Sequence, residues 1–490
     1  MAIKQFGYII LPLLLFCACS KTGGADEPQR DNSDLPAACD YIQGGGANAT
    51  GGKGGTIYIV SMLEDSIDPG ENKPVPGTLR YAVEQGDARI IVFQQAGIIH
   101  LKKPLTISKG NITINGQSAP GTGICIADYP LIIKETENVI VRFLRFRMGE
   151  AGSVKNNTEY DAVSVNNSKR VVLDHLSCSW SVDECVSCYG NTDFTMQYCF
   201  VTESLRKSVH GKGTHGYAGI WGGGNASFHH NLLAHHDSRN PRFDHDYVDS
   251  RIAGPIDYVN NVVYNWGGNS AYGGEGSTRG AGGRHINFVA NYYKPGKATN
   301  SKVRTRLVDP WTSCSNCIDA CGGSVVPPVL YLTDNTMDGS DEVTADNWKG
   351  STYTGANART DVRWTDGMTA LIKEQTAAEA YETVLAKAGC SLQRDAIDTR
   401  IVSEVRNGNY TYEGSNGSSG GLIDTPSDVG GWPEYTGTKA LDSDYDGIPD
   451  EWEAERGLNP NSYADGRTQT LVPGYSNYEV YLNAIVAHLY

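Results

Sequence analysis

Three asparagines, Asn231, Asn261 and Asn291, recur at intervals of 30 residues. Each lies between short segments of apolar and aromatic residues. A residue type that recurs at a fixed interval in this setting is typical of a stacked coil, in which each turn buries its inner face and equivalent side chains hydrogen-bond along the stack. This periodicity therefore favours a repetitive β fold.

Short segments rich in β-branched residues continue on both sides of this repeat, separated by irregular loops. Helical 3.6-residue patterning is scarce among them. An antiparallel β-sandwich or a propeller would also use many short strands. The irregular loops and the aligned asparagines favour an all-β protein instead, namely a right-handed parallel β-helix with peripheral loops and short helices.

Two segments carry helical signals. Residues 76–83 indicate a turn that leads into a short helix, and residues 376–387, followed by Gly389, predict a helix that packs back on the coil. The predicted organisation is a lipoprotein signal peptide at 1–19, a polar tether at 20–43, a parallel β-helix domain at 44–405, a linker at 406–430 and a small calcium-binding module at 431–490.

The N-terminal residues indicate a processing signal. Lys4 precedes an apolar stretch at 6–16 that is too short to span a bilayer as a stable helix. The sequence FCAC at 16–19 resembles a bacterial lipoprotein cleavage box with Cys19 as the lipidated residue, and an ordinary secretory signal is the alternative. We therefore expect an exported protein. It would be an outer-membrane lipoprotein, on the cell surface or the periplasmic face and held only by its lipid anchor, or a secreted protein.

The net charge of −15 excludes the basic footprint that nucleic-acid binding needs. It would also repel an acidic polysaccharide at long range, so a site for such a polymer must be locally basic or hold a cation. Nothing in the sequence indicates oligomerisation, and we expect a monomer.

Ten of the twelve cysteines follow Cys17 and Cys19. In an exported protein they can form disulfides. The spacings Cys185-x2-Cys188 and 314-x2-317-x3-321 also resemble zinc-binding spacings. We favour one or two disulfides around residues 314–321 and buried thiols elsewhere, because several other cysteines lie within apolar strand-like segments. These are Cys125, Cys178 and Cys199.

The segment 442–453, DSDYDGIPDEWE, matches a twelve-residue calcium loop. Carboxylates occupy positions 1, 3, 5, 9 and 12, and a glycine at position 6 permits the sharp turn that brings the oxygens together. We expect a structural calcium site, because no base or substrate-facing group lies beside it. Its predicted ligands are Asp442, Asp444, Asp446, Ile448 through its carbonyl, Asp450 and Glu453.

The stretch from 159 to 243 carries charged side chains that a coil could gather into one site. It contains an acidic cluster, a His-Gly-Lys segment at 210–212 and the sequence RNPR at 239–242. Successive turns would present acid, lysine and arginine together, which suits metal-assisted attack on an acidic sugar polymer. Aspartates in such turns also cap backbone amides, and Arg206 and Lys207 are alternatives to Lys212. The acidic residues are Glu159, Asp161, Asp183 and Glu184.

The chain resembles the pectate lyases, a family of parallel β-helix polysaccharide lyases. The matching segments occur in the family's order and cover roughly residues 50 to 300. They are PGTLR at 76–80, TINGQSAPG at 113–121, VIVRFLRFR at 139–147, DAVSV at 161–165, VLDH at 172–175, HHN at 229–231 and RNPR at 239–242. The acidic loop near the C-terminus resembles a calcium-binding tail appended to exported bacterial glycan enzymes.

This resemblance implies Ca²⁺-dependent β-elimination within pectate (homogalacturonan), an acidic polysaccharide of 4-linked galacturonate. It assigns Arg239 as the base, and it assigns Lys212 together with Ca²⁺ to stabilise the enolate charge on the substrate carboxylate. An arginine has a pKa above about 12 in water, so the base role requires desolvation and neighbouring positive charge.

The resemblance also assigns substrate binding to Arg242 and places Asp161 and Asp183 as calcium ligands with Glu159 as a partner. Two positions depart from the family. Ser187 stands where an acid is common, so Glu184 is the candidate for the missing oxygen, and Asp244 stands where an arginine is common. The candidates to compensate for that arginine are Arg251, Arg279 and Arg284.

Four histidines lie near these segments. His215, in the glycine-rich loop beside Lys212, is a candidate to line the cleft and bind substrate. The other three, His175, His229 and His230, are expected to pack within the coil.

Alternative functions remain. A lyase on methyl-esterified pectin would need no calcium and would line its cleft with aromatic residues, which the acidic cluster disfavours. A non-catalytic glycan-binding or adhesive surface β-helix would lack the pair Lys212 and Arg239. A zinc-dependent hydrolase would use the cysteine pairs.

Overall fold

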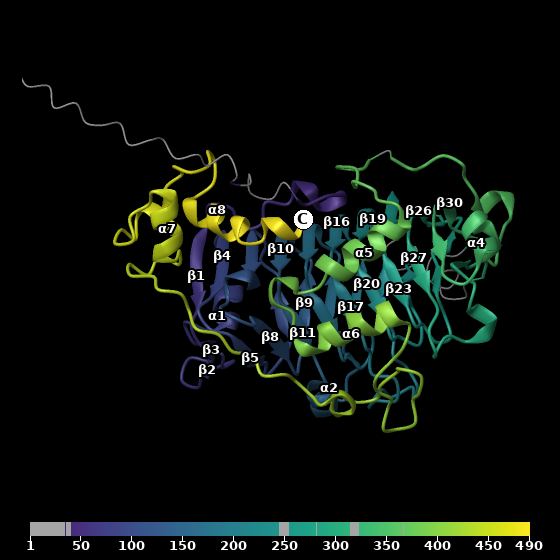
Figure 1. Cartoon of the computed structure of the whole chain (residues 1–490), viewed down its shortest axis with the longest axis horizontal. Helices are drawn as coiled ribbons and strands as arrows, with labels where there is room; N and C mark the ends of the chain where they lie inside the picture. The colour runs from purple at the N-terminus through teal and green to yellow at the C-terminus, as the bar shows by residue number, and fades with distance from the viewer. Residues whose placement is uncertain (1–34, 36–40, 245–253, 281, 314–322, 366) are drawn as a thin grey trace, which may run out of the picture.

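Three parallel β-sheets wind around one core. The computed structural model describes residue 35 and residues 41–490, except 245–253, 281, 314–322 and 366. The chain visits the three sheets in turn, and each strand pairs in parallel with its equivalent one turn later. The predicted parallel β-helix is therefore confirmed, and its axis runs along the long dimension of the molecule (Figure 1).

The strands are as follows. The first sheet contains β1 (Thr56–Val60), β4 (Arg89–Phe93), β7 (Ile112–Asn115), β10 (Glu137–Arg142), β13 (Lys169–Asp174), β16 (Thr192–Gln197), β19 (Gly224–His229), β22 (Pro255–Val259), β26 (His285–Val289) and β30 (Val329–Thr333). The second contains β5 (Gly97–His100), β8 (Ile124–Ala127), β11 (Arg145–Arg147), β14 (Ser177–Ser179), β17 (Phe200–Thr202), β20 (Leu232–Ala234), β23 (Val262–Tyr264), β27 (Tyr292–Lys294) and β31 (Thr336–Met337). The third contains β6 (Leu105–Ile107), β9 (Leu131–Lys134), β12 (Val163–Asn166), β15 (Val186–Tyr189), β18 (Ile220–Trp221), β21 (Arg242–Phe243), β24 (Ala271–Gly273) and β28 (Val308–Pro310). Two small antiparallel two-stranded sheets lie outside the coil: β2 (Ile67–Asp68) with β3 (Lys73–Pro74), and β25 (Gly276–Ser277) with β29 (Val325–Val326).

The asparagine repeat forms a hydrogen-bonded ladder at the turn between the first and second sheets. The Nδ2 of Asn231 donates to Oδ1 of Asn261 at 3.0 Å, and Asn261 donates in the same way to Asn291 at 3.0 Å. The ladder continues beyond the predicted repeat to Asn335 at 2.9 Å and Asn347 at 3.0 Å. All five are buried, so each amide satisfies polar groups of its neighbours that water cannot reach.

Aromatic rings from successive coils stack at the position that immediately follows a strand of the first sheet, one residue before the asparagine position. Phe143, His175, Tyr198 and His230 each have a positive φ, between 50° and 55°, and their ring centroids follow one another at 4.6, 5.0 and 4.8 Å. All four rings are buried. The prediction that His175 and His230 pack within the coil is thus confirmed, and His229 is buried beside them.

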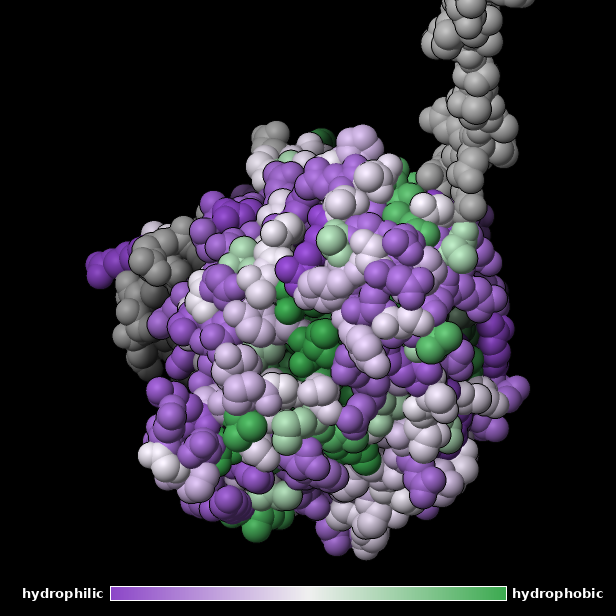
Figure 2. Space-filling model, turned by 90° about the vertical axis from the view of Figure 1, so that its left-hand side faces the viewer, coloured by the Kyte–Doolittle hydropathy of each residue, from purple (hydrophilic) through white to green (hydrophobic). Residues whose placement is uncertain are grey.

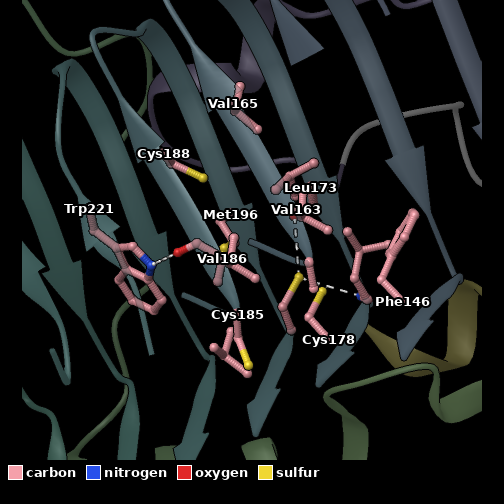
Figure 3. Close-up of a cluster of buried hydrophobic side chains, with 14 of the residues drawn as sticks. Phe146, Val163, Val165, Leu173, Cys178, Cys185, Val186, Cys188, Met196 and Trp221 are labelled. Carbon is pink, nitrogen blue, oxygen red and sulfur yellow. Dashed lines mark hydrogen bonds between the residues drawn. The ribbon is translucent and has the colours of Figure 1, made fainter. Parts of the chain in front are cut away.

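The interior between the sheets is filled by apolar side chains from every turn. Figure 3 shows Val163, Leu173 and Met196 pointing toward one another across this space, with the indole of Trp221 donating to the carbonyl of Val186 at 3.0 Å. Cys185 belongs to the same cluster. The predicted buried free thiols are confirmed for Cys125, Cys178, Cys185, Cys188, Cys199 and Cys390. Among the described residues, Cys185 and Cys188 do not belong to any cluster of metal-ligating side chains. The disulfides predicted around 314–321 lie outside the described residues.

Helices cover one end and one face of the coil. α1 (Leu79–Glu84) packs Leu79 and Val83 into the core of the first turns, and α5 (Ala377–Lys387) and α6 (Ala396–Asn407) lie along the second sheet (Figure 1). The predicted helix at 376–387 is confirmed: it begins with a capping box of Thr376 and Glu379. Asp395, at the start of α6, makes a bidentate ion pair with buried Arg147 of β11. Two short helices, α2 (Ala151–Asn156) and α4 (Asp341–Ala345), lie in loops.

The segment predicted as a linker, 406–430, contacts the β-helix. The backbone of Arg206 donates to the carbonyl of Ile423 at 2.8 Å, and that of Lys207 donates to Asp424 at 2.9 Å. Ile423 and Asp424 are fully buried. This segment therefore supports the loop that follows β17 rather than spanning solvent between two bodies.

The C-terminal residues lie at the N-terminal end of the β-helix. α7 (Asp450–Arg456) and α8 (Asn477–Ala484) pack on the outer face of the first sheet, where Tyr478 and Leu482 contact Ile90 and Val92 (Figure 1). Figure 2 views this end, on which hydrophobic residues form small separate patches among polar ones. Among the described residues, none of the helices is both long enough and apolar enough to cross a membrane.

Candidate active site

The predicted acidic residues lie where successive strands of the third sheet begin. Strands β12, β15 and β18 pair in parallel. The residues just before these strands are paired too: Glu184 is bridged to Tyr217, and Tyr217 is bridged to Ser238. Asp161 and Glu184 each precede their strand by two residues. The coil therefore brings residues that are far apart in sequence onto one edge.

A β-bulge sets the direction of Arg239. Ile220 follows Tyr217 by three positions, whereas its partner Arg242 follows Ser238 by four. The extra residue distorts this turn, and Arg239 has a φ of 56°. Its guanidinium lies 4.6 Å from the centre of the Tyr217 ring and forms an ion pair with Glu184. Its side chain is 23% exposed, so it reaches the cavity described below.

Three carboxylates form a compact cluster. One oxygen from each of Asp161, Asp183 and Glu184 lies within 4.8 Å of the others. Asp161 is held in place because it accepts hydrogen bonds from the hydroxyl of Ser164 at 2.6 Å and from the backbone of Glu184 at 3.1 Å. Burial, together with the neighbouring charge of Asp183, raises the pKa of Asp161 to about 7.

Two histidines support Asp183. The rings of His210 and His215 stack with centroids 3.7 Å apart. The Nε2 atom of His215 lies 2.7 Å from Oδ1 of Asp183, and that of His210 lies 3.7 Å from it. Burial opposes ionisation of Asp183, but the hydrogen bond and charge of His215 outweigh it and lower its pKa. His215, predicted to bind substrate, therefore lines the cavity and also orients a carboxylate.

Lys212 also lines the cavity, and it lies on a short exposed loop. Oε1 of Glu159 accepts from the backbone of Gly211 at 3.2 Å, and Nδ1 of His210 accepts from the backbone of Lys212 at 3.1 Å. These contacts hold the loop beside the acidic cluster. Glu159, predicted as a partner in metal binding, lines the cavity but is not a member of the three-carboxylate cluster.

These groups line one open cavity of about 350 Å³. Its lining combines four acids with Lys212, Arg239 and His215, so negative and positive groups face each other. The lining residues are Pro130, Ile132, Glu159, Tyr160, Asp161, Ser164, Asp183, Glu184, Ser187, Tyr189, Lys212, His215, Ile220 and Arg239. Ser164 and Tyr217 were not singled out from the sequence, because the pairing of Ser164 with Ser187 and of Tyr217 with Glu184 is visible only in the folded coil.

The carboxylate cluster fits an oxygen-preferring divalent cation. Ca²⁺ binds carboxylate oxygens, and three of them converge in the cavity, where Glu184 is buried and Asp161 and Asp183 are partly exposed. The raised pKa of Asp161 reflects the same grouping of carboxylates, because desolvation and the negative charge of Asp183 both disfavour a further negative charge there. Ser187 replaces the acid expected from the family, and Glu184 lies where it can supply that oxygen.

Arg242 lies away from this cavity. Its guanidinium pairs with buried Glu275 at 2.7 Å and lies 4.4 Å from the ring centre of Trp311. Arg284, considered as a replacement for the arginine missing at 244, instead forms a buried ion pair with Asp244 at 2.8 Å. Arg279 does not line the cavity, and Arg251 lies outside the described residues.

The predicted C-terminal calcium ligands separate into two groups. Asp444, Asp446 and Glu453 lie together, whereas Asp450 accepts from both the backbone and the hydroxyl of Ser443 at 2.7 Å. Oδ2 of Asp442 pairs with Lys439 at 2.6 Å, and the backbone of Ile448 donates to Asp446. Asp465, which sequence reasoning missed, completes the cluster of four. Cys19, the predicted lipidated residue, lies outside the described residues.

Comparisons with known proteins give a consistent result. The profile of the pectate lyase family matches residues 41–265. The chain is 32% identical to "Probable pectate lyase C" of Aspergillus flavus, over 91% of this chain and 94% of that protein, and equally identical to its namesake in Aspergillus terreus over the same shares. Among solved structures, a pectate lyase bound to a hexasaccharide has a TM-score of 0.46 at 16% identity, covering 72% of this chain and 98% of that one.

Proposed function

Because the chain belongs to the pectate lyase family, and is therefore a polysaccharide lyase, we propose that it cleaves 4-linked galacturonan (pectate) by calcium-dependent β-elimination. The observation that carries this proposal is the cavity in which Asp161, Asp183 and Glu184 face Lys212 and Arg239. These are the groups that removal of a proton next to a carboxylate requires: a cation site, a positive side chain and a base.

The substrate is an acidic polymer, and the protein itself carries a net charge of −15. Lys212 and Arg239 supply local positive charge for a uronate carboxylate, in spite of this overall repulsion. Asp161, Asp183 and Glu184 are the residues that would hold Ca²⁺. The bound ion would neutralise the uronate carboxylate and so make the proton at C5 more acidic.

Arg239 is the proposed base, and this role requires that its guanidinium lose a proton before the reaction. A guanidinium is ordinarily protonated, so it accepts a proton only where water is excluded and positive charge is near. Arg239 contacts Glu184, which also belongs to the carboxylate cluster, so one carboxylate serves both groups. We expect Arg239 to reach C5 only when its ion pair with Glu184 loosens.

Lys212 has the complementary task. Its ammonium group neutralises negative charge as it develops on the substrate carboxylate during proton removal. The loop that carries it is fixed by Glu159 through Gly211. A positive group that is already in place costs no reorganisation at the moment of reaction, which is why a fixed loop favours catalysis.

The location and partners of the protein are part of the same proposal. We propose an exported monomer that acts on acidic polysaccharide, anchored by a lipid on Cys19 or secreted, and that does not bind nucleic acid. The support is the N-terminal signal pattern and the acidic net charge. The domain boundaries at 44, 405 and 431 likewise remain sequence-based proposals.

The test is the ultraviolet absorbance of the 4,5-unsaturated uronate product, measured for Arg239→Ala on polygalacturonate. We expect kcat to fall by about 10²–10⁴-fold, the usual contribution of a general base. Arg170→Ala is the matched control, because Arg170 also pairs with an acid, Glu137 at 3.0 Å, and is 30% exposed but lies on the first sheet. Equal activity of the two variants would refute the base role. Activity only on methyl-esterified pectin, insensitive to chelator, would favour the alternative lyase.

A further inference from the structure

Four carboxylates from two separate segments meet near the C-terminus. One oxygen from each of Asp444, Asp446, Glu453 and Asp465 lies within 4.8 Å of the others. The first three belong to the loop 442–453, whereas Asp465 begins η8 (Asp465–Arg467), beyond α7. An acidic cluster alone does not make a site, so the state of the individual oxygens decides what this one can bind.

Glu453 is completely buried, and within the described part of the chain neither of its carboxylate oxygens has a hydrogen-bond partner. Oδ2 of Asp446, which is 5% exposed, is also unpartnered there. Burial without a partner is costly for any carboxylate and more so for several together.

The backbone of the loop fixes one oxygen of each aspartate and leaves the other for the cluster. Oδ1 of Asp444 accepts from the backbone of Asp446 at 3.0 Å, and Oδ1 of Asp446 accepts from that of Ile448 at 2.7 Å. The remaining Oδ2 atoms of Asp444 and Asp446 are buried without a hydrogen bond among the described residues. Gly447 has a φ of 103°, the left-handed conformation that this sharp turn needs.

Asp465 approaches the loop from outside it. Its Oδ2 accepts from the backbone of Asn459 at 2.7 Å, while its Oδ1 is unpartnered among the described residues. The next residue is Gly466, where a Cβ atom would lie 1.9 Å from Oδ2 of Asp446. This segment can therefore pass close to the cluster only because it has no side chain at that position.

We propose that this cluster is a calcium site built from two segments, in which Asp465 supplies the carboxylate that Asp450 does not. Asp450 is engaged with Ser443 and shapes the loop instead. The donors are all carboxylate oxygens, which suits Ca²⁺ and does not suit the nitrogen- and sulfur-preferring metals. The site is separate from the proposed active site and does not depend on it.

The ion would fasten the C-terminus of the chain to the β-helix. Asn477, the first residue of α8, donates to the carbonyl of Asp465 at 2.9 Å, and Tyr478 packs on Gly447. Tyr478 and Ile448 belong to one hydrophobic cluster with Ile90 and Val92 of the first sheet. The site thus links the loop, η8 and α8 to one another and to the outside of the first coils.

The last residue extends this attachment. The hydroxyl of Tyr490 accepts from Arg142 at 2.7 Å and contacts Asp174, and its carbonyl accepts from Lys387 at 2.8 Å. Loss of the ion would therefore loosen α8 first and expose this end of the coil. We expect calcium to raise the unfolding temperature of the full chain and to protect residues 431–490 from proteolysis.

The test is calorimetric titration of chelator-stripped full-length protein with calcium, in an Asp183→Asn background that weakens the active-site cluster. Asp465→Asn should lower the affinity of the remaining site by about 10–100-fold or more, since supporting contacts of metal ligands alone are worth that much. Asp361→Asn is the control, because Asp361 is 85% exposed and lies elsewhere. At the same calcium concentration, the ion should also raise the unfolding temperature of the control more than that of Asp465→Asn.

Equal calcium affinity of Asp465→Asn and Asp361→Asn would overturn the two-segment site. If Asp465→Asn does not fold, Asp444→Asn decides, because Asp444 is only partly buried and its replacement disturbs packing less. Unchanged affinity of that variant would overturn the site as well. Magnesium that binds as tightly as calcium would contradict the assignment of the ion. The two readouts are calcium binding and thermal stability, so this test is independent of whether the protein cleaves pectate.

Discussion

Replacing Asn261 by alanine tests whether the asparagine ladder stabilises the β-helix. Oδ1 of Asn261 accepts from the backbone of Asn231 at 3.1 Å and from its side chain at 3.0 Å. Its Nδ2 donates to the carbonyl of Phe228 at 2.9 Å and to Oδ1 of Asn291 at 3.0 Å. In Asn261→Ala the N–H of Asn231 and the C=O of Phe228 both lose a buried partner. At about 1–3 kcal/mol for each group, the expected loss in free energy of unfolding is about 2–6 kcal/mol.

The assay is equilibrium unfolding in denaturant, followed by circular dichroism. A loss of this size is a large part of the roughly 5–15 kcal/mol that typically stabilises a protein, so the midpoint should fall well below that of wild type. Asn409→Ala is the control, because Asn409 is exposed and its replacement should change stability by no more than about 0.5 kcal/mol. If Asn261→Ala unfolds at the same denaturant concentration as Asn409→Ala, the ladder contributes nothing and the reasoning is refuted.

Further predictions concern the site, acid stability and the core thiols. His215→Ala should raise the calcium concentration needed for half-maximal activity by about 10–100-fold, because His215 orients Asp183; an unchanged calcium dependence would contradict this role. Burial opposes ionisation of Glu404, but His235, 3.0 Å away, outweighs it and lowers the pKa of Glu404 to about 2. Its stabilising contribution is therefore present above pH 4.5 and lost as the pH falls toward 2, so unfolding curves of Glu404→Gln should vary less over this range than those of wild type. Burial raises the pKa of Cys185 to about 12, and mass spectrometry should find it alkylated only after unfolding.

The sequence was sufficient to predict the coil because its signals are local and repeated. Asn231, Asn261 and Asn291 each occupy the same turn, so their spacing reports directly on the length of one coil. The helix of residues 376–387 was equally visible, since its cap and its end are both encoded next to it. Local signals of this kind predict an element without any knowledge of its distant contacts.

Long-range pairing was the part that the sequence did not reveal. Arg242 was assigned to substrate, yet it pairs with Glu275, a residue one coil later whose partner no local pattern indicates. Asp465 lies twelve positions after Glu453 and outside the calcium-loop motif, so only folding shows that the two meet. The segment 406–430 has the composition of a linker, but its few apolar residues, such as Ile423, are buried against the coil.

The candidate site was predicted in composition but not in geometry. The acids, Lys212 and Arg239 were identified by their order on successive segments, and the structure brings them to one cavity. The bulge that turns Arg239 toward this cavity depends on one extra residue in its coil, which no sequence motif marked in advance. The contact of Arg239 with Glu184, and hence the shared use of that carboxylate, follows from this geometry alone.

The central claim is that the wild-type protein cleaves pectate by elimination with the help of a cation held by Asp161, Asp183 and Glu184. The most direct measurement follows the ultraviolet absorbance of polygalacturonate incubated with chelator-stripped protein, before and after calcium is added. We predict no absorbance from 4,5-unsaturated uronate in the stripped protein and its appearance when calcium is restored. Formation of that product without calcium would contradict the cation site, and new reducing ends without any absorbance would contradict elimination.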